Sequence, residues 1–243
     1  MFKVSQNVTV HFIGIGGIGM SGIAEVLLAN GLNVSGSDLS QSTRTEKLEK
    51  LGAKVFIGHH SENVVDATVI VYSSAINEKN PEYTYALEKK VPLMRRAEML
   101  AELMRLKKGI AIAGTHGKTT TTSFLSTILE ESKYDPTYII GGVVANLRGH
   151  AKVGKGEFLV AEADESDGSF LLLNPIMSLI TNIDNDHLDY YGSFQNLKDS
   201  FTEFANKVPF YGHCSINIED ENLRDIRKLI KKPVITFSLG KSN

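Results

Sequence analysis

The sequence has little that would tie it to a membrane or to an oxidising compartment. It contains one cysteine, Cys214, in 243 residues, and a single cysteine cannot form an internal disulfide. Its first residues lack the charged-then-apolar pattern of a secretory signal. No apolar run approaches the ~20 residues that a membrane helix requires, because glycines and polar residues interrupt every candidate. We therefore expect a soluble, cytoplasmic protein with no membrane partner.

A strong charge of either sign is also lacking. The formal net charge is −2 and there is no block of basic residues, so nothing favours nucleic acid or an anionic membrane as the main partner. A content of 42% hydrophobic and 22% charged residues is ordinary for a globular protein. The length is sufficient for two compact α/β domains, and a small-molecule partner is favoured.

The first part of the chain alternates strand and helix patterns. A buried strand at 8–13 leads through a glycine-rich turn into an apolar-periodic helix. The expected elements are strands at 8–13, 33–37, 54–57, 67–73 and 91–94, and helices at 18–28, 43–51 and 81–90. This alternation predicts a doubly wound, Rossmann-like domain with a parallel sheet over residues 1–105.

A second α/β run follows a helix at 95–107 and a break at 107–109. We expect strands at 110–113, 157–163, 176–182 and 233–237, helices at 118–131, 194–206 and 220–230, and a further segment at 214–218. A doubly wound domain would normally continue beyond the last of these strands. We therefore expect an α/β domain over residues 106–243 that is truncated.

The first glycine-rich turn fits the G-x-G-x-x-G pattern between a strand and a helix. It consists of Gly14, Ile15, Gly16, Gly17, Ile18 and Gly19. Backbone N–H groups and the positive end of a helix meet there, so an anion is expected. Asp38 follows about 20 residues on, where a carboxylate could accept a ribose hydroxyl. A nicotinamide dinucleotide or another diphosphate-linked ribonucleotide would fit. The alternative without a ligand is that these glycines only allow a tight turn and close helix packing.

The second glycine-rich turn is more specific. It consists of Gly114, Thr115, His116, Gly117, Lys118, Thr119 and Thr120, between a strand and a Thr-rich helix start. Lys118 can reach β- and γ-phosphates, Thr119 can hold magnesium, and the loop amides can surround phosphate oxygens. The general pattern would have a glycine where this chain has Ile112, so the loop is two residues shorter than usual. The motif predicts the use of ATP with Mg²⁺.

Polar side chains gather at the ends of two later strands. The first strand ends in the carboxylates Glu162, Asp164, Glu165 and Asp167, and the next is followed by His187. Ligands bind at the carboxyl ends of strands in open parallel sheets, and Mg²⁺ prefers oxygen ligands. An unpaired carboxylate inside a strand is costly, so we interpret Glu162 as a cation ligand rather than part of a solvated loop. His187 is a candidate metal ligand or phosphate contact, the alternative being a surface histidine.

Seven motifs in this order carry a family resemblance. They are HFIGIGGIGMSGIA, SGSD, VYSSAI, RRAEML, GTHGKTTTT, AEADESDGSF and TNIDNDHLDYYG, spread over residues 11–192. The series closely resembles the Mur ligases of bacterial cell-wall synthesis, and the short spacing before Gly117 matches that family. Its members have a Rossmann-like domain for a UDP-sugar, a central P-loop ATPase domain and a C-terminal domain. The resemblance implies that residues 106–243 are the P-loop ATPase domain, truncated, and that the C-terminal domain is absent.

The resemblance implies a reaction and residue roles. An ATP-dependent ligase would phosphorylate the carboxylate of UDP-N-acetylmuramate and let the amine of L-alanine attack the acyl phosphate. Lys118 would contact the γ-phosphate, Thr119 one Mg²⁺, and Glu162 and His187 Mg²⁺ near the substrate carboxylate. The first glycine loop would hold the UDP diphosphate, and the residues that would contact uridine or ribose are Asp38, His59, Ser73 and Ser74.

Three alternatives stay open at this point. A sister ligase could attach a recycled peptide to the same UDP-sugar. A nicotinamide-dependent dehydrogenase with a fortuitous Gly-Lys-Thr, or a non-catalytic UDP-sugar-binding module, would also retain the first glycine loop. Some related ligases use a carbamylated lysine near the position of Lys198, and we assign Lys198 no role.

Overall fold

The computed structural model describes residues 8–73, 75–142 and 149–240. Contacts between Cα atoms divide the chain into two compact units, one formed by residues 1–100 and 141–153 and the other by 101–140 and 154–243. The division falls inside helix α4 (Arg96–Arg105). Strand β8 (Ala151–Lys152), which follows the central gap, belongs to the first unit.

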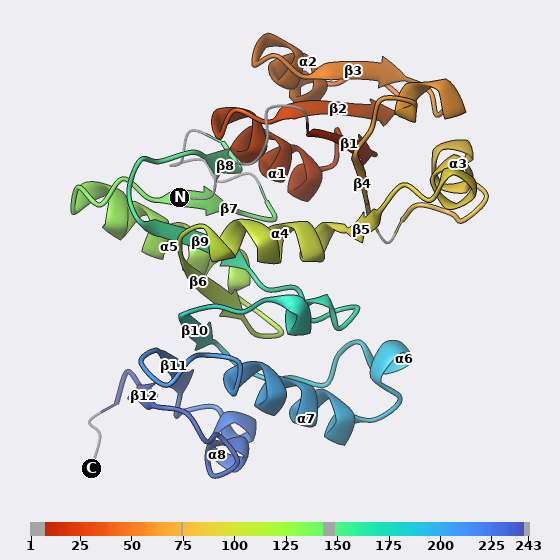
Figure 1. Ribbon diagram of the computed structural model, residues 1–243. Helices are drawn as coiled ribbons and strands as arrows, with labels where there is room; N and C mark the ends of the chain where they lie inside the picture. The colour runs from red at the N-terminus through yellow and green to blue at the C-terminus, as the bar shows by residue number, and fades with distance from the viewer. Residues whose placement is uncertain (1–7, 74, 143–148, 241–243) are drawn as a thin grey trace. The chain divides into compact units, whose positions relative to one another are not determined.

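The first unit has a five-stranded parallel sheet in the order β3-β2-β1-β4-β5 (Figure 1). Its strands are β1 (Thr9–Ile13), β2 (Asn33–Asp38), β3 (Lys54–Ile57), β4 (Val69–Tyr72) and β5 (Leu93–Arg95). The connecting helices are α1 (Ile18–Ala29), α2 (Thr43–Lys50), η1 (Ser61–Val64) and α3 (Pro81–Lys89). The predicted parallel, doubly wound arrangement is confirmed.

Local sequence signals explain where these helices start. Ser42 accepts a hydrogen bond from the Thr45 amide and forms a capping box at α2. Asn80 caps α3 and Pro81 occupies its first turn, where a missing N–H costs nothing. Right-handed crossovers from β1 to β2 and from β4 to β5 run in opposite directions, which puts α1 and α3 on opposite faces of the sheet.

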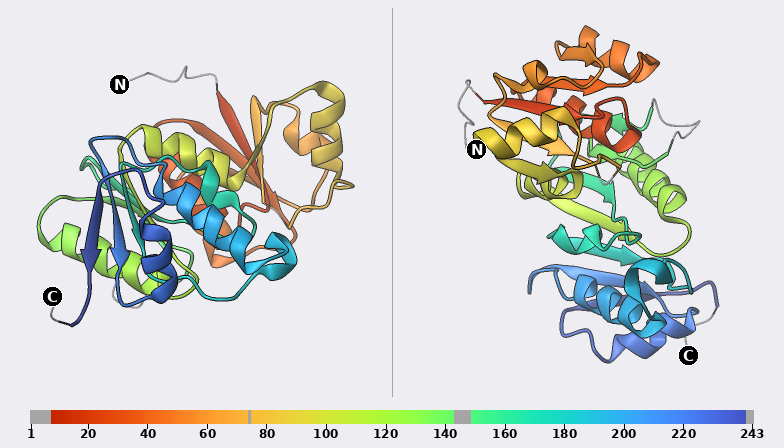
Figure 2. Two further views of the ribbon diagram at one scale, coloured as in Figure 1. Left: turned by 90° about the horizontal axis from the view of Figure 1, so that it is seen from below. Right: turned by 90° about the vertical axis from the view of Figure 1, so that its right-hand side faces the viewer.

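The second unit also has parallel strand pairs, in the order β12-β11-β10-β6-β9-β7. The strands are β6 (Lys108–Ala113), β7 (Thr137–Ile139), β9 (Phe158–Glu162), β10 (Met177–Ile180), β11 (His213–Asn217) and β12 (Val234–Phe237). The helices are α5 (Lys118–Glu131), η2 (Ser169–Leu172), α6 (Leu188–Tyr191), α7 (Phe194–Ala205) and α8 (Glu221–Arg227). Helices α5 and α7 lie on opposite faces of this sheet (Figure 2).

The strand order places the ends of β6, β9 and β10 side by side, because β6 pairs with both neighbours. The chain leaves β6 toward β7 on one side and returns past β9 to β10 on the other. This is a topological switch point, where the loops after adjacent strands diverge and leave room for a ligand. The loops that carry Lys118, Glu165 and His187 all start at this edge.

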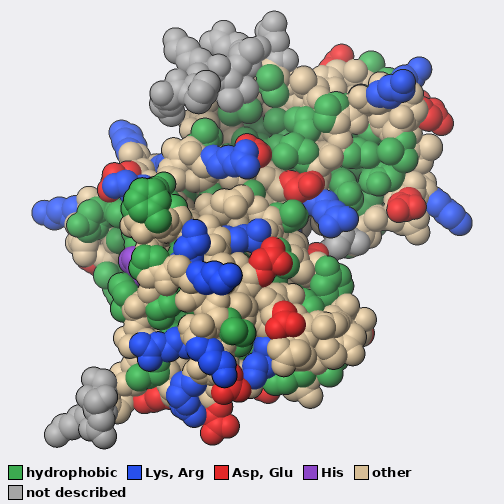
Figure 3. Space-filling model, turned by 60° about the horizontal axis from the view of Figure 1, so that its bottom comes forward, with side chains coloured by type: hydrophobic (Ala, Val, Ile, Leu, Met, Phe, Trp, Pro, Cys, Tyr) green, Lys and Arg blue, Asp and Glu red, His purple; other side chains and the backbone are tan. Residues whose placement is uncertain are grey.

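The surface is of mixed character. On the face drawn in Figure 3, charged side chains of both signs are interspersed with exposed hydrophobic ones, as on most globular proteins. Within the described residues, no helix is long and apolar enough to cross a membrane.

Candidate active site

The second glycine-rich turn connects β6 to α5 and depends on two glycines with positive φ. Gly114 has φ +132°, and a Cβ there would come within 2.0 Å of Thr181 Oγ1. Gly117 has φ +84° and directly precedes α5. Both positions lie in the region that favours glycine, so the sequence allows a tight loop over the start of a helix. The last residues of the motif, Lys118, Thr119 and Thr120, lie in the first turn of α5.

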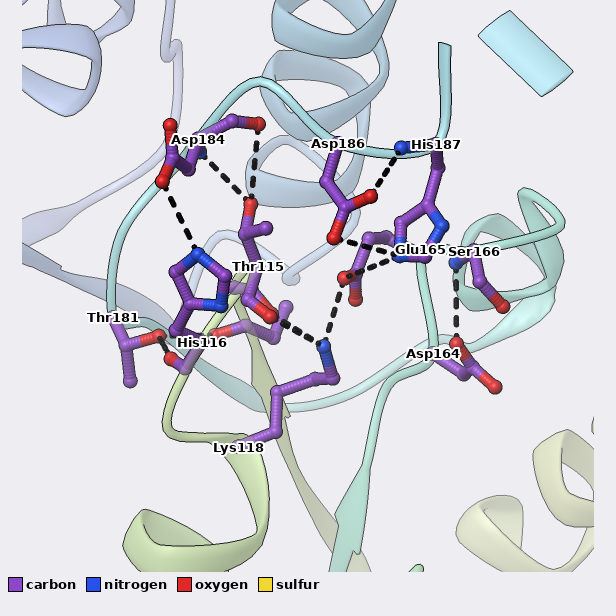
Figure 4. Close-up of polar contacts among 12 residues, drawn as sticks. Thr115, His116, Lys118, Asp164, Glu165, Ser166, Thr181, Asp184, Asp186 and His187 are labelled. Carbon is purple, nitrogen blue, oxygen red and sulfur yellow. Dashed lines mark hydrogen bonds and ion pairs between the residues drawn. The ribbon is translucent and has the colours of Figure 1, made fainter. Parts of the chain in front are cut away.

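The loop after β10 supports this turn through a set of hydrogen bonds. Thr181 Oγ1 donates to the carbonyl of His116 (2.7 Å), and the His116 amide donates to Asn182 Oδ1 (2.9 Å). The Asp184 amide donates to Thr115 Oγ1 (2.9 Å), and His116 Nε2 lies 3.1 Å from Asp184 Oδ2. The pKa of Asp184 is lowered, first by a hydrogen bond from the Asn185 amide and then by His116. The loop is therefore largely pre-formed (Figure 4).

Lys118 points from α5 into this edge of the sheet and uses all three of its donors. Its Nζ donates to the carbonyls of Gly114 (2.7 Å) and Thr115 (3.2 Å) and to Glu165 Oε1 (2.8 Å). The Glu165 side chain is only 1% exposed, whereas that of Lys118 is 18% exposed. Glu165 Oε2 is buried and has no hydrogen-bond partner among the described residues. A buried acceptor of this kind can receive a hydrogen bond from a ligand or a water molecule.

The environment of Glu165 disfavours its charged form. Burial raises the pKa of its carboxyl group, and the hydrogen bond and charge of Lys118 offset only part of that rise. Tyr191 donates its hydroxyl to the Glu165 carbonyl (2.5 Å), and burial followed by the nearby carboxylates raises the pKa of that phenol. Perturbed groups of this kind gather at functional sites.

His187 approaches the same carboxylate from the loop after β10. Its Nε2 lies 3.7 Å from Glu165 Oε1 and 3.7 Å from Asp186 Oδ2 (Figure 4). The residue has φ 56°, an uncommon conformation for a non-glycine residue that holds it at the start of α6. The structure thus brings Lys118 and His187 together around Glu165, a member of the acidic cluster to which the sequence assigned no individual role.

Glu162 stands at the last position of β9, half-buried and in register with Ile112 of β6. Its place at the switch point agrees with a role there, as does that of Thr119. Within the described ranges, no three or more His, Cys, Asp or Glu side chains form a metal-holding group. Mg²⁺ needs fewer protein ligands when phosphate oxygens and water complete its shell, so Thr119, Glu162 and His187 remain candidates.

The first glycine loop is tied to the end of β2. The amides of Gly14 and Ile15 both donate to the Ser37 carbonyl (2.8 and 3.0 Å), and the Gly16 amide donates to Asp38 Oδ2 (2.8 Å). The Gly17 amide donates back to the Gly14 carbonyl (3.1 Å). Asp38 therefore shapes the loop, a contact that the sequence does not reveal.

Two other residues expected to contact the nucleotide, His59 and Ser73, follow strands of the same sheet. His59 follows β3, and its Nδ1 lies 2.8 Å from Ser37 Oγ. Ser73 follows β4 and is half-buried, while Ser74 lies outside the described residues. Ile18 and Gly19 begin α1. Lys198 is in the second unit, where its Nζ pairs with Asp225 Oδ2 at 2.9 Å.

A pocket of about 380 Å³ adjoins the phosphate-binding loop in the second unit. It is lined by His116, Gly117, Thr121, Leu179, Thr181, Asn182, Asn217 and Phe237. The last two come from β11 and β12, and neither belongs to a motif that the sequence analysis recognised.

Together these features define an α/β protein of the P-loop class, with a lysine–carboxylate pair at the switch point of its sheet. Residues 9–108 match the family described as "Mur ligase family, catalytic domain", and residues 112–243 match "Mur ligase middle domain". The chain belongs to the Mur ligase family.

Similar proteins of known name fall in the same family. The chain is 56% identical over 231 residues to the UDP-N-acetylmuramate--L-alanine ligase of Geotalea uraniireducens, covering 95% of this chain and 50% of that protein. It is 57% identical to the enzyme of the same name from Trichlorobacter lovleyi, over 95% of this chain and 51% of that protein. The chain spans about half the length of the curated relatives it matches.

Solved structures agree. The UDP-N-acetylmuramate-alanine ligase of Thermotoga maritima superposes with a TM-score of 0.82 at 34% identity, over 96% of this chain and 53% of that one. The UDP-N-acetylmuramate:L-alanyl-gamma-D-glutamyl-meso-diaminopimelate ligase from Neisseria meningitides gives 0.86 at 28% identity, over 97% and 81%. The fold expected from the resemblance is confirmed.

Proposed function

We propose that the protein bearing this chain is an ATP-dependent ligase that joins L-alanine to the carboxylate of UDP-N-acetylmuramate in the synthesis of peptidoglycan precursors. The observation that carries the proposal is the convergence of Lys118, Glu165 and His187 from three loops at one switch point. Relatives that are 52–57% identical bear the name of this activity. Such an enzyme would work in the cytoplasm, where its nucleotide substrates are found.

The reaction needs two steps. The substrate carboxylate attacks the γ-phosphorus of ATP, which forms an acyl phosphate and releases ADP. The amine of L-alanine then attacks the acyl carbon, which forms the amide, expels phosphate and releases a proton. Because the carboxylate and the triphosphate are both negative, the first step requires positive charge and fixed positions.

Lys118 supports this step at the γ-phosphate. In the structure its Nζ is held by two loop carbonyls and by Glu165 Oε1. A phosphate oxygen would replace the Glu165 contact, while the carbonyl contacts keep the ammonium group in place. The buried charge of Glu165 thus keeps Lys118 oriented before the nucleotide arrives.

Mg²⁺ fits the oxygen donors at this edge, since a threonine hydroxyl and a carboxylate suit it when phosphate supplies further oxygens, whereas an imidazole is a less usual ligand for this ion. Thr119, Glu162 and His187 would hold it, and His187 is already fixed by its backbone conformation. When bound, the ion screens the repulsion between phosphate and carboxylate oxygens.

The first unit would carry the UDP-sugar. Its glycine loop lies at the carboxyl end of β1, next to the start of α1, where a diphosphate is favoured. The residues proposed to line the uridine or ribose are Asp38, His59, Ser73 and Ser74. A nicotinamide-dependent dehydrogenase has no support from the family match.

The second candidate is the peptide-recycling ligase, which the Neisseria structure favours at 28% identity. The higher identity of the alanine-adding relatives argues for L-alanine as the acceptor.

A phosphate-release assay tests the proposal, with the protein expressed at the length of its curated relatives. UDP-N-acetylmuramate, ATP and Mg²⁺ are combined with L-alanine, glycine, L-serine or the L-Ala-containing tripeptide that a recycling ligase would use. L-Alanine should stimulate release most strongly, and release should require the UDP-sugar. Preference for the tripeptide would identify the recycling ligase, and release that is independent of the UDP-sugar would refute both.

A further inference from the structure

A carboxylate to which the sequence assigned no role is buried below the sheet edge of the first unit that carries the first glycine loop. Glu82, in the first turn of α3, has a side chain that is 0% exposed. Its Oε1 accepts hydrogen bonds from Asn63 Nδ2 (2.7 Å) and from the His60 amide (3.3 Å). Its Oε2 accepts from Ser37 Oγ (2.5 Å) and lies 3.5 Å from His11 Nε2. Every group around this carboxylate can donate.

Glu82 is therefore ionised. Burial opposes the charge, but the interactions with His11, Ser37 and Asn63 outweigh it and hold the pKa of this carboxyl below its usual value. Its position at a helix N-terminus adds to the same effect. An ionised carboxylate only accepts hydrogen bonds, so the Ser37 hydroxyl must donate to it.

The direction of the Ser37 hydrogen bond determines which ring nitrogen of His59 carries the proton. A serine hydroxyl has one hydrogen, and that of Ser37 is given to Glu82. The remaining contact of Ser37 Oγ, with His59 Nδ1 at 2.8 Å, must therefore be donated by Nδ1–H. His59 Nδ1 also lies 3.5 Å from Glu82 Oε2, which favours the same proton position. In the neutral ring, Nε2 then carries a lone pair and accepts.

We infer that Glu82 is a positioning residue that fixes the tautomer of His59, so that Nε2 presents a hydrogen-bond acceptor to an N–H or O–H donor of a uridine nucleotide. The inference rests on the proposed function for its ligand. His59 lies at the same sheet edge as the first glycine loop. The Gly58 amide before it donates to the carbonyl of Asp38 (2.8 Å), and the Asp38 side chain accepts from the Gly16 amide of that loop. The His59 side chain is 14% exposed, so part of the ring is open to a ligand.

Uridine offers two donors of this chemistry, the imide N–H of the base and the ribose hydroxyls. An imidazole lone pair accepts a hydrogen bond from either group. An imidazole N–H cannot pair with the imide N–H, and it pairs with a ribose hydroxyl only if that hydroxyl turns round to accept. The tautomer therefore decides how strongly the site binds the nucleoside.

The Glu82→Gln substitution should reverse the relay. The donors at the Oε1 position, the His60 amide and Asn63 Nδ2, require the carbonyl oxygen of the glutamine there. Its NH2 group must then face Ser37 Oγ, which becomes the acceptor and gives its own proton to His59 Nδ1. Nε2 of His59 would change from acceptor to donor with no loss of side-chain volume.

Long-range ¹H–¹⁵N NMR of the histidine rings in the 243-residue chain tests this directly, with His59 assigned by comparison with His59→Gln. The wild type should show the Nδ1–H tautomer and Glu82→Gln the Nε2–H tautomer. An Nε2–H tautomer in the wild type would overturn the inference even if the variant fails to fold. An unchanged tautomer in a folded Glu82→Gln variant would also overturn it.

Calorimetric titration with UDP then links the tautomer to binding. Glu82→Gln should weaken UDP binding by about tenfold, the cost of an acceptor turned into a donor. In a His59→Gln background the same substitution should have no further effect. Glu25→Gln is the matched control, because Glu25 is another buried carboxylate of this unit that pairs with Lys47 (2.7 Å), and it should change neither readout.

Two UDP analogues show which uridine group donates to His59. One of them, N3-methyl-UDP or 2′,3′-dideoxy-UDP, should bind the wild type and Glu82→Gln equally, because that analogue lacks the group whose hydrogen bond His59 accepts. If Glu82→Gln weakens neither UDP nor its analogues, the role of the tautomer in binding is refuted. A wild-type chain that shows the Nδ1–H tautomer and binds no UDP would refute the proposed nucleotide site instead, so the two failures are distinguishable.

Discussion

Replacing Lys118 by methionine should destabilise the chain through Glu165. The substitution removes an ammonium group that lies 2.8 Å from a carboxylate that is 1% exposed, and Oε2 of that carboxylate already has no partner among the described residues. Removing one partner of a buried ion pair costs about 3–5 kcal/mol. The Lys118 side chain is 18% exposed, so water reaches this pair in part and we expect a loss of about 2–4 kcal/mol.

The double variant shows whether the carboxylate is the cause. Glu165→Gln keeps an acceptor for Lys118 and should cost only about 1 kcal/mol. When Glu165→Gln is added to Lys118→Met, it removes the buried carboxylate charge that has lost its lysine partner. The double variant should therefore be more stable than Lys118→Met alone. The expected coupling free energy is about 1.5–3 kcal/mol.

A surface pair provides the control. Lys198 Nζ lies 2.9 Å from Asp225 Oδ2 and its side chain is 14% exposed, much like Lys118, but the Asp225 side chain is 67% exposed. Lys198→Met should cost less than about 1 kcal/mol, since water solvates the carboxylate that remains. Urea denaturation followed by circular dichroism measures all four variants. Additive effects of Lys118→Met and Glu165→Gln, within about 0.5 kcal/mol, would refute the reasoning.

Three further predictions concern other parts of the chain. Gly114→Ala should weaken Mg-nucleotide binding at least tenfold, because its Cβ would come within 2.0 Å of Thr181 Oγ1; unchanged affinity by calorimetry would contradict the loop geometry. Asp38→Ala should weaken UDP-sugar binding and leave ATP binding unchanged, since it frees the Gly16 amide of the first glycine loop; equal losses at both sites would contradict this. Cys214 is buried, and burial raises the pKa of its thiol to about 11, so at pH 8 a maleimide should react with it only after unfolding by urea; rapid labelling of the native chain would contradict its burial.

The sequence predicted which residues follow the buried strands and therefore gather at the carboxyl edge of each sheet, because strand and helix patterns alternate strongly and the ends of parallel strands coincide. It made Lys118 and His187 candidate site residues through their places after buried strands. It did not separate Glu165 from its acidic neighbours, since the distinction depends on burial beneath Tyr191 and on the reach of Lys118. Such contacts join residues that are distant in the chain.

Short elements were also missed for physical reasons. Strand β7 has three residues after a proline and α6 has four, which is too few for a hydrophobic period to be visible. The relay from Glu82 through Ser37 to His59 links α3, β2 and the end of β3. A lone glutamate in the first turn of a helix is usually interpreted as a capping residue, so the relay is recognised only from the burial of Glu82.

The most direct test of the account is calorimetric titration of the 243-residue chain with Mg-AMP-PNP and with UDP-N-acetylmuramate. It compares the wild type, Glu165→Gln, and the Lys118→Met, Glu165→Gln double variant, in which the stranded charge is absent. The double variant should bind Mg-AMP-PNP at least about tenfold more weakly than Glu165→Gln, while its affinity for the UDP-sugar stays within about threefold. Equal Mg-AMP-PNP affinities, or the joint loss of both ligands in a folded double variant, would contradict the assignment of ATP to the second glycine loop and the UDP-sugar to the first.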